Sequence, residues 1–232
     1  MQIRIPELPW SPYGLLVVLS LLAGFFVAVR LMRRFKVEKR AIFYTCLLTF
    51  VCTFTISLSV TFRITENGLQ AAFSGLGAVV GMIIGVFLST LIIKDKPDIV
   101  MASFVACAPL MYGLAKSGCL FAGCCHGKEY EGFMAVVYHG TESYFPVQLI
   151  DMAAFILVHI ISLILLFKLK NKITAIYLML AMLVPVRFVL EYLRYYHDGS
   201  LIASGQITVL IAGAIAVILI TVWKFILKIN YH

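Results

Sequence analysis

Seven apolar runs, each long enough to cross a bilayer as a helix, alternate with short polar segments along this chain. They cover roughly residues 13–32, 41–62, 72–93, 98–119, 147–167, 173–193 and 201–223. A helix needs about 20 mainly apolar residues to span the hydrocarbon core of a membrane. The pattern therefore predicts an all-α polytopic membrane protein, with seven transmembrane helices in a single domain over residues 1–232.

The polar segments between the runs predict how the chain is oriented. Basic residues lie mainly in four connections, at 30–40, at 94–96, at 168–172 and in the tail with Lys224 and Lys228. These connections follow the odd-numbered runs, so all four can face the cytoplasm together, as the positive-inside rule requires. We therefore expect the N-terminus outside, the C-terminus in the cytoplasm and the 119–146 loop on the outer face. The first run is too long for a cleaved signal peptide and is expected to stay.

Composition supports the membrane assignment and excludes other classes. Hydrophobic residues make up 62% of the 232 residues, and the mean hydropathy is +1.01, which excludes a water-soluble globule. The net charge of +8 reflects the basic connections, so we expect no nucleic-acid partner. In the third run, glycines at 77, 81 and 85 indicate close packing against another helix. A site lining near Ser74 is the alternative.

The segment from Lys116 to Lys128, K-S-G-C-L-F-A-G-C-C-H-G-K, carries the densest chemistry of the chain. Its glycines indicate a sharply turned backbone packed against protein, which the small thiols of Cys119, Cys124 and Cys125 could line. A disulfide from Cys119 to one of the other two is an alternative. A metal site is another, although vicinal cysteines chelate one ion poorly. The favoured interpretation involves no metal and no cofactor.

Charged residues near the outer end of the sixth run indicate a functional site, because charges at membrane depth are costly. Arg187, Glu191 and Arg194 stand at i, i+4 and i+7, which would place them on one helical face. We expect Arg187 to grip a phosphate bidentately and Glu191 to orient it; an interhelical ion-pair clamp is the alternative. Lys116 is a second cation for an anionic headgroup, or else a snorkelling anchor.

Two histidines and a carboxylate complete the candidates. His126 or His139 could take a proton from an incoming nucleophile near neutral pH, although either could be an ordinary surface histidine. Asp151, after Gln148 at the start of the fifth run, could orient such a group or hold the loop. The segments 116–128, 146–151 and 187–194 are predicted to form one site at one membrane face.

Several ordered segments resemble the prolipoprotein diacylglyceryl transferase family. They are Tyr13-Gly14, F-S-G-L-G-A-V-V-G in the third run, the 116–128 segment, P-V-Q-L-I-D, R-F-V-L-E-Y-L-R and S-G-Q at 204–206. The resemblance implies transfer of a diacylglyceryl group from phosphatidylglycerol, or a similar anionic phospholipid, to the lipobox cysteine of a prolipoprotein signal peptide. It also implies a site toward the outer leaflet of the bacterial cytoplasmic membrane.

Positions can be carried over from the family one by one. The resemblance and the residue chemistry together give the catalytic candidates Arg187, Lys116, Glu191, His126 and Ser74. The expected substrate-binding residues are Tyr13, Gly118, Cys119, Cys124, Gly127, Gln148 and Arg194.

The departures from the family pattern leave the acceptor open. Lys116 stands where an arginine is expected, Cys119 where an asparagine is, and Cys124 where a glutamate is. The family's H-G-G appears here as S-G-L from Ser74. A cysteine-rich branch with G-C-x-x-x-G-C-C-x-G is more similar. A paralogue that lipidates another thiol, a hydroxyl or an amine is therefore an alternative, as is a thiol-redox or metal-handling membrane protein.

Overall fold

The computed structural model describes residues 2–6, 9–61, 63–65, 68–70, 75–138, 142–197 and 202–227, and over 60–76 it describes backbone elements alone. Within these ranges the chain forms seven helices, whose bounds lie within three residues of the predicted runs. They are α1 (Tyr13–Arg34), α2 (Lys39–Thr61), α3 (Gly75–Ile92), α4 (Pro97–Phe121), α5 (Val147–Lys168), α6 (Lys172–Glu191) and α7 (Ser204–Ile226). All but α3 are long and apolar enough to cross a membrane, and the described part of α3 is apolar but shorter.

Two small sheets add to the predicted helices. Strands β1 (Ile3–Arg4), β4 (Val136–Val137) and β5 (Ser143–Tyr144) lie in the order β1-β4-β5, with the first pair parallel and the second antiparallel. Strands β2 (Arg63–Thr65) and β3 (Gly68–Gln70) form an antiparallel hairpin between α2 and α3. Strands of two or three residues are too short for an alternating pattern to reveal.

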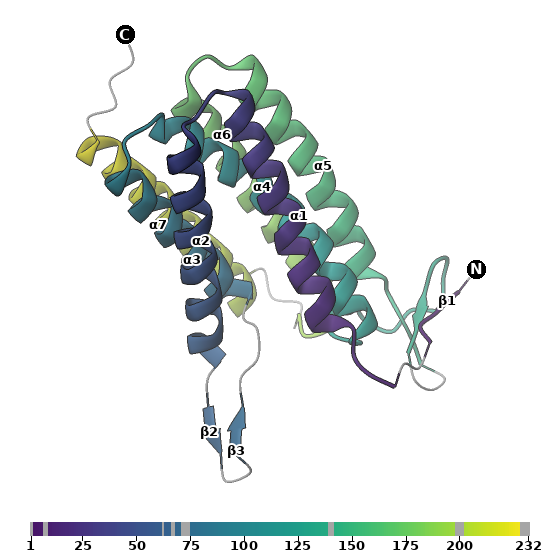
Figure 1. Ribbon diagram of the computed structural model, residues 1–232. Helices are drawn as coiled ribbons and strands as arrows, with labels where there is room; N and C mark the ends of the chain where they lie inside the picture. Colours follow the sequence, from purple (N-terminus) through teal and green to yellow (C-terminus); the bar gives the residue numbers. More distant parts are fainter. Residues whose placement is uncertain are drawn as a thin grey trace.

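Helix α4 occupies the centre of the bundle, between α1 and α5 and against α6 (Figure 1). More than half of its apolar stretch is buried, a larger share than in any other candidate span of the described chain. Phe104 on α4 is fully buried and meets the ring of Phe25 on α1 edge to face, with centroids 5.5 Å apart. Because α4 is central, the chemistry at its C-terminal end is surrounded by other helices.

The glycines of α3 pack directly on α2. A Cβ added at Gly81 would lie 2.4 Å from the Cys52 carbonyl oxygen, and one added at Gly85 would lie 2.4 Å from the Thr49 Cα. The close-packing interpretation is therefore confirmed for these glycines. The α2–α3 pair makes few contacts with α1. An apolar crevice of about 80 Å³ lies between that pair and helices α1 and α4, and Tyr112 is part of its lining.

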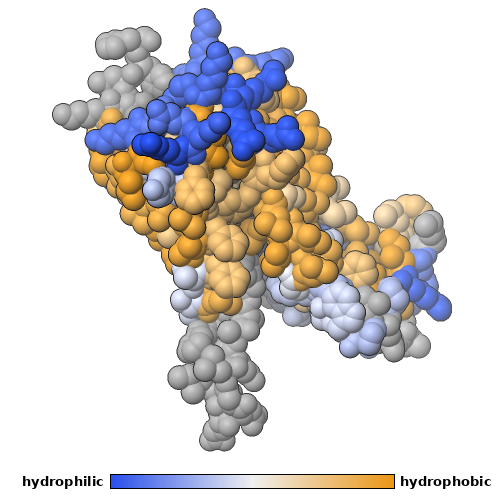
Figure 2. Space-filling view, in the orientation of Figure 1, coloured by the Kyte–Doolittle hydropathy of each residue, from blue (hydrophilic) through white to orange (hydrophobic). Residues whose placement is uncertain are grey.

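The basic connections gather at one end of the bundle. The Lys96 ammonium donates to the carbonyls of Phe35 and Lys36, at 2.9 and 2.8 Å, which ties the α3–α4 connection to the α1–α2 connection. The space-filling view shows hydrophilic residues concentrated over this end and an apolar belt beside it (Figure 2). The loop after α4 and the turn after α6 lie at the other end (Figure 1).

Candidate functional site

The backbone that follows α4 turns back sharply and is fastened to the chain after α6. Gly123 and Cys125 have φ angles of 65° and 60°, and the left-handed region is uncommon for any residue but glycine. Gly127 then pairs with Arg194 in an isolated antiparallel bridge. The predicted turned backbone is present, and it brings the 116–128 segment against the residues after α6.

A buried ion cluster joins the three segments that the sequence predicted to meet. The guanidinium of Arg194 forms an ion pair with Asp151 of α5, and the Lys116 ammonium lies 3.4 Å from the same carboxylate oxygen. The side chains of Arg194, Asp151 and Lys116 are 1%, 0% and 8% exposed. Within the described chain, Asp151 Oδ1 and Arg194 Nε have no hydrogen-bond partner. The cluster therefore holds two cations on one carboxylate.

A second ion pair lies entirely on α6. Arg187 hydrogen-bonds to Glu191 one turn further along the helix, and Glu191 also accepts a hydrogen bond of 2.5 Å from the Tyr196 hydroxyl. Burial and this hydrogen bond raise the pKa of Tyr196 to about 12, so the phenol keeps its proton and donates. A Cβ at Gly205, where α7 begins, would lie 2.1 Å from the Glu191 carboxylate. Glu191 is thus fixed by its surroundings.

The prediction that Arg194 shares a helical face with Arg187 and Glu191 is wrong. Helix α6 ends at Glu191, and Arg194 follows two turn residues later. From there its side chain reaches Asp151 on α5 rather than continuing the row on α6. The helical spacing rule failed because it was applied one turn beyond the end of the helix.

Exposure separates the cations of the site. The Arg187 side chain is 21% exposed, against 8% for Lys116 and 1% for Arg194. Both Arg187 and Lys116 lie near the ring of Tyr112, with Cζ 6.0 Å and Nζ 4.7 Å from its centroid. Among these three cations, Arg187 is the best placed to meet a ligand.

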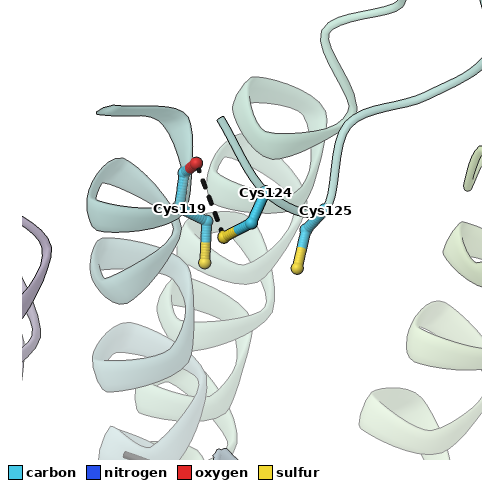
Figure 3. Close-up of side chains that lie close together, drawn as sticks. All are labelled: Cys119, Cys124 and Cys125. Atoms are coloured by element: carbon cyan, nitrogen blue, oxygen red, sulfur yellow. Dashed lines mark hydrogen bonds between the residues drawn. The ribbon is translucent and has the colours of Figure 1, made fainter. Parts of the chain in front are cut away.

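Three thiols lie close together (Figure 3), and the charges of Lys116 and Arg194 in the ion cluster act on one of them, Cys125. The sulfurs of Cys119, Cys124 and Cys125 all lie within 4.8 Å of one another, and all three are free. Hydrogen bonds from the thiols of Cys119 and Cys124 lower the pKa of Cys125 despite its burial, and the charge of Lys116 acts in the same direction. A thiolate on Cys125 is therefore stabilised by its neighbours.

Gln148 secures the loop from α5. Its amide donates to the Cys124 carbonyl and to the Tyr138 hydroxyl, both at 2.7 Å. Burial raises the pKa of Tyr138 to about 12, against the lowering effect of the Gln148 hydrogen bond. Gln148 is thus a support of the cysteine loop as much as a lining residue.

His126 lies in an aromatic cluster next to this loop. Its ring stacks on Tyr195, with centroids 4.6 Å apart, and tilts against Tyr144 at 4.2 Å. Its Nδ1 lies 2.9 Å from the Gly127 carbonyl oxygen. In the neutral ring this contact places the proton on Nδ1 and leaves Nε2 as the acceptor.

At the other predicted lining positions, Gly118 and Gly127, neighbouring residues approach the backbone closely. A Cβ at Gly118 would lie 3.1 Å from the Tyr13 carbonyl oxygen, and one at Gly127 would lie 2.7 Å from the Phe145 Cβ. The Tyr13 side chain also lies close enough to the three thiols to interact with them electrostatically. Ser74 and His139 lie outside the described residues.

Sequence reasoning missed the tyrosines that complete the site. Tyr112 precedes Lys116 by four residues, so helical spacing could have placed the two side chains together. Tyr196 and Tyr138 lie outside the helices, and no spacing rule connects them with Glu191 and Gln148.

The fold and the site define a multi-pass membrane protein with a buried ion cluster and a partly exposed guanidinium at the end of the bundle opposite its basic connections. The family model for prolipoprotein diacylglyceryl transferase matches residues 1–227, and the chain belongs to this family of transferases. The predicted family is thereby confirmed. Comparison with curated proteins gives no match.

Proposed function

We propose that this protein transfers the diacylglyceryl group of phosphatidylglycerol to the thiol of a lipobox cysteine in a prolipoprotein, with release of glycerol phosphate. The observation that carries the proposal is the family match over residues 1–227. The reaction needs a cation at the phosphate, which takes on charge as it leaves. It also needs an acceptor thiol in its thiolate form.

Arg187 is the residue that we assign to the phosphate. It is the most exposed of the three cations, and a guanidinium can hold two phosphate oxygens at once. Glu191, itself held by Tyr196, orients Arg187 until the lipid arrives. Lys116, near the same Tyr112 ring, adds positive charge behind it.

The lipid would enter from the side of the bundle. The crevice between α1, α4 and the α2–α3 pair is apolar and reaches Tyr112, close to both cations. At about 80 Å³ the crevice would have to widen before an acyl chain could enter, and its apolar lining suits such a chain.

We further propose seven membrane spans in a single domain, an outside N-terminus, a cytoplasmic C-terminus and a site at the outer leaflet of a bacterial cytoplasmic membrane. The basic end supports this orientation through the positive-inside rule. The test is labelling of intact cells with an impermeant maleimide. Glu131→Cys should label in intact cells, and Lys94→Cys should label only after permeabilisation. Labelling of the parent protein, which has free cysteines of its own, is the background to subtract. The reverse pattern would overturn the orientation.

The first experiment measures glycerol phosphate release by purified protein in phosphatidylglycerol micelles, with and without a lipobox peptide whose mass is followed. Arg187→Ala should lower peptide-dependent release by about 100-fold or more, the usual effect of removing one donor to a developing oxyanion. Arg33→Ala, an exposed arginine at the basic end, is the matched control and should keep the parental rate. A wild-type rate for Arg187→Ala would refute the assignment.

A different acceptor is the second candidate function. Its support is Ser74, which stands where the family has a histidine. Retained phosphatidylglycerol cleavage without a gain in peptide mass would favour a paralogue that lipidates another thiol, a hydroxyl or an amine. No release under either condition, together with a need for the cysteines in some other reaction, would favour a thiol-redox or metal-handling protein.

A further inference from the structure

The three thiols beside the ion cluster have nearly the spacing of a metal site. Sulfurs bound to one zinc ion at about 2.3 Å stand roughly 4 Å apart. Cys119, Cys124 and Cys125 have all their sulfurs within 4.8 Å of one another. In a triangle with sides of this upper limit, each sulfur would need to move inward by only about 0.6 Å to reach the spacing of three ligands in a tetrahedral zinc site.

The backbone removes the usual objection to neighbouring cysteines as ligands of one ion. With Cys125 at φ 60°, its side chain turns to the same side as those of Cys119 and Cys124 (Figure 3). Such a conformation is costly for a non-glycine residue and persists only when its surroundings impose it. Here Gln148 holds the Cys124 carbonyl at 2.7 Å, and Arg194 holds the Cys125 carbonyl at 2.6 Å.

The charges around the thiols also suit a metal thiolate centre. Lys116 and Arg194 together carry two positive charges, and Asp151 carries one negative charge, which leaves a surplus of +1. Three thiolates with one divalent ion carry −1, so the two groups together are neutral. A buried cluster is most stable when its charges are compensated.

We propose that Cys119, Cys124 and Cys125 bind one zinc ion and leave its fourth position open to the thiol of the acceptor. Gln148 and Arg194 are the positioning residues. Three protein ligands with one open position are typical of catalytic zinc sites, whereas structural sites are closed by four. His126 is outside the sulfur group, so it does not close the site.

The open position would hold the acceptor thiol in its thiolate form. This part of the inference rests on the proposed transferase function. A thiol entering it gives its proton to water, because a coordinating thiol is deprotonated outright. Its sulfur then forms a C–S bond to the glycerol carbon of the lipid, while the C–O bond to phosphate breaks. The electron pair leaves on the phosphate oxygen beside Arg187 and takes up one proton, so that glycerol phosphate is released.

Binding is tested without turnover. The full-length protein in detergent is stripped with chelator, reloaded with zinc or cobalt(II), and measured by elemental analysis and absorption. We expect one ion per chain and the thiolate-to-cobalt charge-transfer bands of a tetrahedral site. Cys119→Ser and Cys125→Ser should lose the stoichiometric ion, whereas Cys46→Ser, a free thiol in α2, should keep it. No stoichiometric zinc, binding of copper(I) alone, or retention of the ion by Cys125→Ser would overturn the site.

Activation is tested with the lipobox peptide. The peptide should shift the cobalt spectrum, and its cysteine-to-serine version should not. A thiol with a pKa of about 8.5 is roughly 3% ionised at pH 7, so chelation should lower peptide-dependent release by up to about 30-fold, and zinc should restore it. Transfer that persists unchanged in the chelated protein would overturn the zinc role while leaving the proposed function standing. A bound ion and a spectral shift without lipid transfer would overturn the proposed transferase function while leaving the zinc site standing.

Discussion

Asp151 is the residue whose loss tests the buried ion cluster most directly. Its carboxylate is fully buried, pairs with Arg194 and lies 3.4 Å from the Lys116 ammonium. Asp151→Asn keeps the shape of the side chain and one acceptor oxygen but removes the negative charge. The two buried cations would then face each other with no compensating charge, and the net charge of the cluster would rise from +1 to +2.

The expected cost follows from the burial of the partners. Removing one member of a buried ion pair typically costs about 3–5 kcal/mol, because the remaining charge stays desolvated and unpaired. The asparagine oxygen can still accept a hydrogen bond from Arg194, so we expect a loss near the lower end, about 3 kcal/mol. Adding Lys116→Gln to Asp151→Asn returns the cluster to +1 and should recover a large part of that loss.

The assay is reversible unfolding in mixed detergent micelles titrated with sodium dodecyl sulfate, followed by tryptophan fluorescence. Glu131→Gln, an exposed carboxylate in the loop, is the control and should change the free energy of unfolding by less than about 0.5 kcal/mol. A loss below about 1 kcal/mol for Asp151→Asn would refute the reasoning, because it would mean that the cations are solvated. If the double variant is no more stable than Asp151→Asn alone, the loss does not come from the uncompensated positive charge of the cluster.

Two further predictions concern helix packing and the α6 ion pair. Gly81→Ala should destabilise the protein by about 1–3 kcal/mol in the same assay, because its Cβ would overlap the α2 backbone. Gly14→Ala, where a Cβ meets nothing within 4 Å, should be nearly neutral, and equal effects of the two would contradict the packing. Tyr196→Phe removes a hydrogen bond to a charged acceptor, worth about 1.5–3 kcal/mol, and should raise KM for phosphatidylglycerol with little change in fold. An unchanged KM would show that the orientation of Glu191 does not depend on Tyr196.

The helices were predictable, and their ends to within three residues, because membrane burial imposes a strong pattern. Runs of about 20 apolar residues interrupted by charges locate each helix but not its last turn. The glycine spacing in α3 was equally informative, since small residues at every fourth position are typical of a face that packs closely on another helix. The meeting of the three polar segments was predictable for the same reason, because they lie at helix ends that the alternation of the helices brings to one end of the bundle.

The details of the site were not predictable because they depend on loop geometry. Arg194 reaches α5 only because α6 ends three residues earlier, and hydrophobic pattern does not define the last turn of a helix so closely. The Cys125 sulfur lies beside the other two from a left-handed backbone conformation, which no local rule assigns to cysteine. Tyr196 reaches Glu191 from a turn, where side-chain directions have no period.

The structure divides the predicted site into two parts with different charge. Arg187 and Glu191 form a neutral pair that reaches the surface, so under the proposed function a phosphate would compete with Glu191 for the guanidinium. Lys116, Arg194 and Asp151 form a buried group with a surplus positive charge that faces the thiols. That surplus favours a thiolate at Cys125, and under the proposed function the anionic headgroup of the lipid would bind Arg187. Under the proposed function, cysteines at the two positions where the resemblance expects an asparagine and a glutamate would change the acceptor side of the site more than the lipid side.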